Sequence, residues 1–305
     1  MIGGINQIDE DILSVEIISD NKNNTCNITD LEINIADNPM VFKSPISDKL
    51  LVCGGNNNRK RCLTLGNDGM WTYLTVDKNK KSKLNSPRRM SAAATTNKAS
   101  FVFGGKMGKE ISSYEYMLSS EKTWRKGNKT IPGGFENGCA VTISDNEIWL
   151  IGGDKANQRR RVLSFNTTNH TFIETNIKLA RERKSHRCSL MPDKSGVMVT
   201  GGTGSSTEII DLKTRKSTET GSMTSVRSLH GIGTLVIDDT PTLVVFGGYT
   251  WASGDRQEEY FTSFEKYDEK NKSWSLWDGA KLKTPRREFG FATLKQSMIC
   301  RDFEN

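Results

Sequence analysis

Apolar runs that end in two consecutive glycines recur along the whole chain. Leu51-Val52-Cys53-Gly54-Gly55 and Phe101-Val102-Phe103-Gly104-Gly105 are two examples. The first glycines of the six pairs are Gly3, Gly54, Gly104, Gly152, Gly201 and Gly247. They lie 51, 50, 48, 49 and 46 residues apart. Spacing this even indicates one structural unit used repeatedly. We therefore predict a single domain over residues 1–305 and not two unrelated domains.

Each repeat carries the pattern of four strands. A short segment of small and β-branched residues, such as 91–96 or 138–143, precedes a polar turn and the run into Gly-Gly. This order predicts a hairpin. A third segment then ends in a bulky residue seven or eight positions before a tryptophan, as in Tyr267 to Trp274 and Tyr116 to Trp124. That spacing predicts a second hairpin. We find no helical period, so each repeat is expected to form one four-stranded blade.

Blades of this length close radially into an all-β propeller. Six repeats predict six blades. The chain begins with what would be the end of a second strand, Met1–Gly4, and finishes with an unpaired first strand at 289–294. We therefore expect the C-terminal strand to complete the first blade and close the ring. Because the chain starts inside a blade, we also expect it to be part of a longer protein.

The repeat resembles a known family. The Gly-Gly run, the Tyr-to-Trp spacing and the arginines that open the first strands are similar to kelch repeats. The opening pairs are Arg183 with His186, Arg227 with His230, and Arg287 with Gly290. The division of one blade between the two ends of the chain most resembles the propeller of kelch-like BTB-BACK-kelch cullin-ligase adaptors. The resemblance covers essentially the whole chain.

That resemblance implies a partner-binding face at the end of the propeller where the second strands finish. One implied set of residues directly follows the glycine pairs: Ile5, Asn56, Lys106, Asp154, Thr203 and Tyr249. The other set opens the first strands: Arg89, Ser185, Ser228 and Glu288. Tyr249 and Trp251 are the expected aromatic anchors, because tyrosine and tryptophan are enriched at binding hot spots. The repeated arginines Arg88, Arg183, Arg227 and Arg287 are expected to brace blades more than to contact a ligand.

Composition adds limits on the function. The formal charge is +7, from 43 basic and 36 acidic side chains. The basic clusters around Arg59, Lys60, Lys106 and Arg159 favour an acidic protein segment as partner. They are too short to predict nucleic-acid binding. No apolar run is long enough to span a membrane, and no secretory signal opens the chain. We expect a cytoplasmic location and no membrane association.

Catalytic chemistry is not indicated. The chain has three histidines, His170, His186 and His230, and two of them occupy the repeated strand-opening position. A structural role is therefore favoured over metal binding, and no cysteine–histidine cluster has zinc spacing. We predict no catalytic residues, no metal and no cofactor. A kelch-type oxidase, whose copper site draws on tyrosine, histidine and cysteine, is an alternative.

The cysteines and glycosylation sequons bear on the compartment. Six cysteines lie scattered without a dense disulfide pattern, and Cys53, Cys139 and Cys188 fall inside apolar runs, so we expect reduced, buried thiols. Six Asn-x-Ser/Thr sequons, at Asn23, Asn27, Asn128, Asn166, Asn169 and Asn271, keep a secreted kelch protein as an alternative.

The sequence thus predicts a non-enzymatic kelch module that captures a peptide or protein segment. The leading hypothesis is the substrate-recognition part of a ubiquitin-ligase adaptor. The alternatives are an actin-binding or cytoskeletal scaffold protein and, less favoured, the secreted protein and the oxidase.

Overall fold

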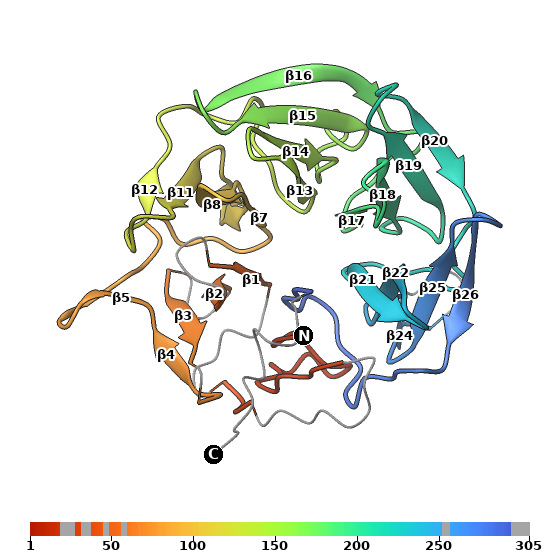
Figure 1. The fold of residues 1–305 in the computed structure, drawn as a ribbon, viewed down its shortest axis with the longest axis horizontal. Coiled ribbons are helices and arrows are strands. Elements are labelled where there is room, and N and C mark those ends of the chain that lie inside the picture. Colours follow the sequence, from red (N-terminus) through yellow and green to blue (C-terminus); the bar gives the residue numbers. More distant parts are fainter. Residues whose placement is uncertain are drawn as a thin grey trace.

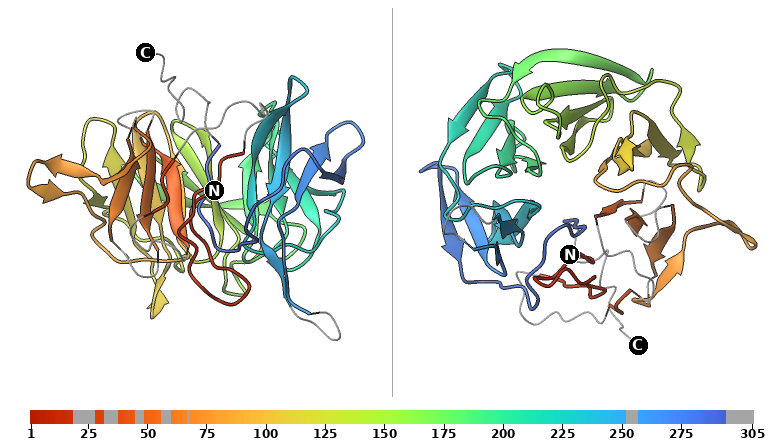
Figure 2. Two further views of the ribbon diagram at one scale, coloured as in Figure 1. Left: turned by 90° about the horizontal axis from the view of Figure 1, so that it is seen from below. Right: turned by 180° about the vertical axis from the view of Figure 1, so that it is seen from behind.

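The chain folds as a β-propeller in this computed structural model, which describes residues 1–18, 28–31, 38–44, 49–55, 60–66, 68–251 and 257–293. Within these ranges it is all β, without helices. Five four-stranded antiparallel sheets stand around a common axis (Figure 1). Seen from the side, their strands run from one face of the ring to the other (Figure 2). No helix that could span a membrane occurs in the described ranges.

The five sheets are called blades A to E, and each runs from the axis outward in chain order. Blade A contains β1 (Pro39–Lys43), β2 (Leu50–Gly54), β3 (Cys62–Leu65) and β4 (Trp71–Tyr73). Blade B contains β7 (Ala92–Thr95), β8 (Ala99–Phe103), β11 (Tyr114–Leu118) and β12 (Arg125–Lys126). Blade C contains β13 (Cys139–Ser144), β14 (Glu147–Ile151), β15 (Arg161–Asn166) and β16 (Thr171–Lys178). Blade D contains β17 (Arg187–Leu190), β18 (Gly196–Thr200), β19 (Thr207–Asp211) and β20 (Ser217–Thr220). Blade E contains β21 (Gly231–Ile237), β22 (Thr240–Phe246), β25 (Phe264–Asp268) and β26 (Ser273–Trp277).

Three two-stranded ribbons extend from the blades. They pair β5 (Thr75–Asp77) with β6 (Lys80–Lys81), β9 (Lys106–Met107) with β10 (Lys109–Glu110), and β23 (Tyr249–Thr250) with β24 (Glu259–Tyr260). The last two ribbons begin directly after a Gly-Gly pair, so they stand on the face where the second strands end.

The hydrophobic core lies between the blades. Every residue of β2, β8 and β18 is buried, because a neighbouring blade covers each face of these second strands. Four apolar clusters join A to B, B to C, C to D and D to E. Tyr267 and Trp274, at the predicted spacing, face each other on β25 and β26 and pack into the cluster between blades D and E. The hydrophobic core therefore consists of the interfaces between neighbouring sheets and not of one central cluster.

The sector between blades E and A holds both ends of the described chain. Residues 1–18 and 287–293 meet there through isolated bridges, Ile2 with Gly290 and Ile5 with Arg287. The prediction of six four-stranded blades is not met, because this sector holds no regular sheet among the described residues. The described residues of this sector form isolated bridges only, at Ile2 and Ile5. Leu294 of the predicted closing strand lies outside the described residues.

Apolar side chains of this sector nevertheless pack on both neighbours. Ile2 belongs to a buried cluster with Leu50 and Val52 of blade A. Phe289 belongs to another with Val244 and Phe246 of blade E. The terminal segments therefore fill the wedge between the two blades.

The first glycine of two pairs lies against a histidine of the neighbouring blade. Gly152 has a φ of 68°, and a Cβ added there would lie 2.4 Å from the His186 ring of blade D. Gly201 stands in the same relation to His230, at 2.8 Å. Any side chain would separate the blades at this point. The two histidines therefore fill interfaces between blades, in the structural role predicted for them.

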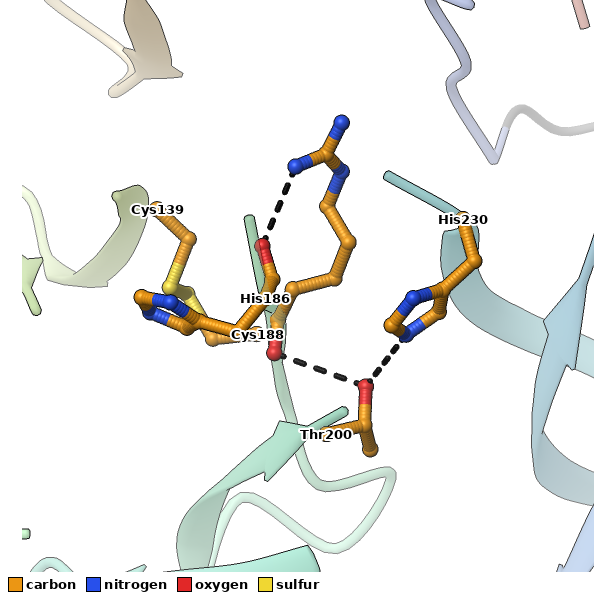
Figure 3. The surroundings of a disulfide bond; sticks show 6 residues. Cys139, His186, Cys188, Thr200 and His230 are labelled. Atoms are coloured by element: carbon orange, nitrogen blue, oxygen red, sulfur yellow. Dashed lines mark hydrogen bonds between the residues drawn. A yellow bond between two sulfur atoms is a disulfide. The ribbon is translucent and has the colours of Figure 1, made fainter. Parts of the chain in front are cut away.

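Two disulfides overturn the prediction of reduced cysteines. Cys53 and Cys62 face each other on β2 and β3, with 4.2 Å between their Cα atoms. Cys139 and Cys188 link the inner strands of blades C and D, 5.9 Å apart at Cα (Figure 3). The fold brings both pairs within bonding reach, which spacing along the chain did not reveal. Cys26 and Cys300 lie outside the described residues.

Candidate partner-binding face

The two predicted sets of face residues lie together. Antiparallel hairpins send alternate turns to opposite ends of a blade, so the residues after Gly-Gly and those that open the inner strands share one end. We call this end of the propeller the Gly-Gly face. Lys106 bridges to Arg89, and Tyr249 bridges to Ser228. Asn56 lies outside the described residues.

A ring of left-handed residues marks the centre of this face. One such residue precedes each inner strand: Asn38, Met90, Asn137, Ser185, Leu229 and Glu288, with φ between 52° and 59°. Backbone hydrogen bonds run from each amide to the carbonyl of the previous member, as from Ser185 to Asn137 at 2.9 Å. The amide of Asn38 donates to the carbonyl of Glu288 at 2.8 Å. Among the described residues, Met90 is the exception to this pattern, because its amide makes no such bond to Asn38.

Four arginines are buried just before this ring. They are Arg88, Arg183, Arg227 and Arg286, each with a side chain at most 1% exposed. Each forms an ion pair with a buried glutamate, Glu115, Glu208, Glu265 and Glu16 respectively. The bracing role predicted for Arg88, Arg183 and Arg227 is confirmed. The fourth brace is Arg286 and not the predicted Arg287, because the opening motif of the last strand begins one residue earlier.

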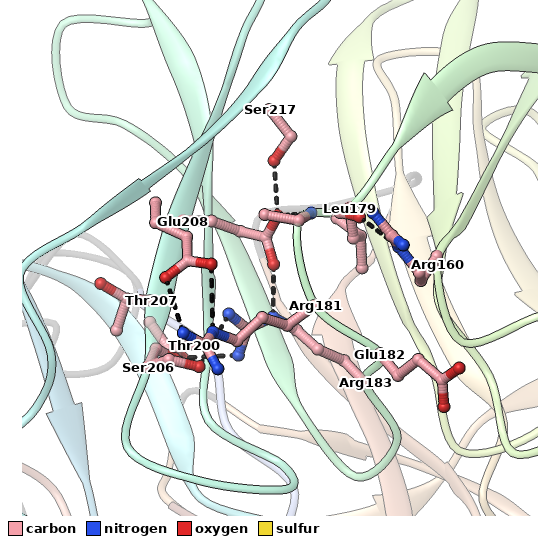
Figure 4. Close-up of polar contacts among 12 residues, drawn as sticks. Arg160, Leu179, Arg181, Glu182, Arg183, Thr200, Ser206, Thr207, Glu208 and Ser217 are labelled. Atoms are coloured by element: carbon pink, nitrogen blue, oxygen red, sulfur yellow. Dashed lines mark hydrogen bonds and ion pairs between the residues drawn. The ribbon is translucent and has the colours of Figure 1, made fainter.

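The Arg183 site shows how this brace works (Figure 4). Its Nε donates to Glu208 at 2.6 Å, and Nη1 donates to the carbonyls of Gly201 and Ser206, both at 2.9 Å. Glu208 also accepts the backbone amide of Ala180 at 2.6 Å. The pair therefore ties the loop between blades C and D to the glycine pair and third strand of blade D.

Burial disfavours the charged form of the bracing arginines, and the paired glutamates favour it. Burial lowers the pKa of the Arg88, Arg227 and Arg286 guanidiniums, and the paired glutamate opposes that change in each case. A buried charge that loses its partner is costly. The arginines are therefore committed to the scaffold and are not exposed to a ligand.

Blade C lacks both charges of the brace. Phe135 stands where blades B, D and E and the terminal sector have arginine. Leu163, which pairs with Leu150, stands where they have glutamate. Both are fully buried in the cluster between blades B and C. An apolar pair thus replaces the ion pair as a unit.

Several predicted contact residues are not accessible on the Gly-Gly face. Tyr249 and Ser228 are fully buried, and Ser185 and Glu288 are 5% and 7% exposed. The remaining described members of the two sets reach the surface: Ile5, Arg89, Lys106, Asp154 and Thr203. Tyr249 therefore cannot be a direct anchor, contrary to the prediction.

Trp251 is the exposed end of an aromatic stack that the buried tyrosine supports. Its side chain is 54% exposed, and its ring centroid lies 4.8 Å from that of Tyr249. Tyr260 packs on Tyr249 at 5.5 Å, and the Arg287 guanidinium lies 4.6 Å from the Tyr249 ring. Burial raises the pKa of Tyr260 to about 12, so both tyrosines are neutral at physiological pH. Sequence reasoning missed Arg287 as a cation–π partner.

Basic side chains on this face have acidic neighbours. Lys106 pairs with Glu136 at 3.5 Å, Lys184 with Asp154 at 3.4 Å, and Arg159 with Glu182 at 3.5 Å. Such exposed pairs contribute little stability. They do reduce the positive charge that a partner would meet on this part of the face.

Two of the three histidines, His186 and His230, are fully buried. Burial lowers the pKa of His186 to about 3, so this side chain is neutral in the fold. His230 is also fully buried, with Nε2 at 2.8 Å from the Thr200 hydroxyl (Figure 3). Among the described residues, no group of three or more His, Cys, Asp or Glu side chains is placed to hold a metal ion.

No protein-family model matches the chain, and no curated protein matches it.

Proposed function

We propose that the chain is a six-bladed kelch-type propeller that captures a peptide or protein segment on its Gly-Gly face. Three observations support closure by the terminal segments. They bridge to each other at Ile2 and Gly290, they pack on blades A and E, and the amide of Asn38 donates to Glu288. The recurring Gly-Gly pairs and opening arginines support kelch repeats.

The observation that carries the binding proposal is the exposure of Trp251. A large aromatic side chain that is half in solvent but held from behind by Tyr249 and Tyr260 can bury apolar area at low entropic cost. Hot spots of protein interfaces are rich in such residues. The rigid ring beneath it supplies the fixed scaffold that binding loops need.

The disulfides change the compartment that we propose. Disulfides persist in oxidising environments and are rare in the cytosol. Cys53–Cys62 and Cys139–Cys188 therefore favour a secreted or lumenal protein over the cytoplasmic one expected from the sequence. Asn128, Asn169 and Asn271 of the sequons are exposed, as glycan attachment requires. For the same reason we do not extend the proposal to a ligase adaptor or an actin-binding protein, which work in the reducing cytoplasm.

Peptide selection tests the binding proposal. Peptides displayed on phage are selected on the oxidised propeller and then measured against Trp251→Ala and Leu276→Ala. Leu276 is the matched control, since it is 57% exposed on the outer strand β26. We expect Trp251→Ala to weaken binding at least tenfold with an unchanged melting temperature, and Leu276→Ala to bind normally. Selected peptides that bind Trp251→Ala as tightly as the parent chain would refute the proposed site.

A further inference from the structure

A cavity of about 200 Å³ lies in the central channel at the Gly-Gly face. Its rim includes Asn38, Met90 and Asn137 of the left-handed ring, and its wall is formed by the first residues of the inner strands. Pro39, Ala92 and Phe289 are among these. A water molecule's share of liquid volume is about 30 Å³. The cavity is thus large enough for a small organic group.

Arg187 is the one charged residue among the residues that line this cavity. It opens β17 of blade D and is partly buried. Its Nη1 donates to the carbonyl of the adjacent His186 at 3.0 Å. Within the described part of the chain, no carboxylate forms an ion pair with it, whereas each of the four bracing arginines has one.

The buried surroundings of Arg187 disfavour its positive charge unless an anion lies beside it. Burial lowers the pKa of its guanidinium to about 10, and the Glu288 carboxylate offsets only part of that change. The Glu288 carboxylate forms an ion pair with Arg287 at 3.2 Å and accepts a hydrogen bond from the side-chain amide of Asn38. His186 is neutral in the fold, so Arg187 remains the positive centre of the channel mouth.

We propose that the channel mouth binds a single carboxylate group on the Arg187 guanidinium. The planar fork of arginine matches the two oxygens of a carboxylate. The one positive charge of the cavity lining balances a monoanion, whereas a phosphate dianion would bring an uncompensated charge out of water. The apolar strand residues around it can hold the attached carbon chain.

The carboxylate can come from a small acid or from an acidic side chain of a bound segment. The site itself does not rest on the proposed protein partner, because a free carboxylate can probe it directly. Binding through Trp251 and binding through Arg187 can therefore fail independently.

Titration of the Arg187 side chain tests this proposal. The folded, oxidised chain is titrated at constant ionic strength with acetate and, separately, with N-acetyl-glutamate methylamide, while NMR follows the Arg187 Nε–H signal. We expect a saturable shift of that signal in the parent chain. The backbone amide of Gly290, which lines the same cavity, reports binding in every variant and should show at least a tenfold loss of affinity in Arg187→Gln. Arg181→Gln is the matched control, because Arg181 is exposed and paired with Glu219 at 3.1 Å. It should bind like the parent chain.

The two probes separate the sources of the carboxylate. Equal affinity supports a site for free small acids, and preference for the blocked glutamate supports an acidic residue of a bound segment. An Arg187 signal unmoved by both probes, or equal binding by Arg187→Gln, overturns the proposal. Arg187→Gln should keep its melting temperature, since it leaves no buried carboxylate unpaired, so loss of binding is not loss of fold.

Discussion

At the scale of single residues, the brace on each loop between blades is the most informative feature. Blades B, D and E and the terminal sector each use a buried arginine–glutamate pair, and blade C uses Phe135 with Leu163. The chain thus contains its own apolar replacement for the ion pair. Replacement of a buried ion pair by well-packed apolar residues is often neutral, whereas removal of one partner is strongly destabilising.

This comparison predicts non-additive mutations in blade E. Glu265→Leu leaves Arg227 buried without its carboxylate and should cost about 3–5 kcal/mol of unfolding free energy. Arg227→Phe leaves Glu265 unpaired and should cost a similar amount. The double variant, which copies blade C, should recover most of the loss. Urea unfolding at pH 7 measures all three.

Two results would count against this account of the brace. One is a single variant that loses less than about 1 kcal/mol, which is typical of exposed pairs. The other is a double variant whose loss equals the sum of the two single losses, since residues in contact should not behave additively.

The sequence predicted the bracing arginines but not their partners. Arg88, Arg183 and Arg227 recur at a fixed distance before the inner strands of blades B, D and E, so their repetition was visible. The glutamates lie in a repeated Ser-x-Glu triplet, at Ser113 to Glu115, Ser206 to Glu208 and Ser263 to Glu265. The loops between Gly-Gly and this triplet differ in length, and that variation hides the register. Tyr249 and Trp251 were both predicted as aromatic anchors. The burial of Tyr249 depends on Tyr260 and Arg287, which the fold brings against its ring.

At the scale of elements, the inner strands join neighbouring blades. β13 and β17 lie side by side, and the Cys139–Cys188 disulfide links them across the boundary between blades C and D. The two cysteines are 49 residues apart, the same interval as Gly152 and Gly201. Cysteines one repeat apart occupy equivalent places in neighbouring blades, which is why these two meet. Neither separation, 9 or 49 residues, indicates a disulfide until each cysteine is assigned to a strand of a blade.

The two disulfides should differ in their effect on stability. Chain-entropy arguments assign about 4 kcal/mol to a closed loop of 49 residues and about 2.5 kcal/mol to one of 9. Cys139→Ala with Cys188→Ala should therefore lower the melting temperature more than Cys53→Ala with Cys62→Ala. Thermal unfolding without reductant measures the difference. A larger loss from the short loop would show that strand packing, and not loop closure, dominates.

At the scale of the whole molecule, we propose that the sector shared by the two ends closes the ring. Six even repeats were sufficient to predict blades A to E and the position of the Gly-Gly face. They were not sufficient to predict the irregular structure of the sixth sector, because pairing there joins the two ends of the described chain, as between Ile2 and Gly290. Its contacts are bridges and apolar packing on both sides.

Native-state hydrogen exchange tests that closure most directly. The amide of Ile2 donates to Gly290 at 2.8 Å, that of Gly290 to Ile2 at 3.0 Å, and that of Asn38 to Glu288 at 2.8 Å. If the ends close the ring, these three amides should exchange as slowly as the amides of β18, through global unfolding. Exchange at Ile2 and Gly290 that is orders of magnitude faster than in β18 would contradict a closed propeller.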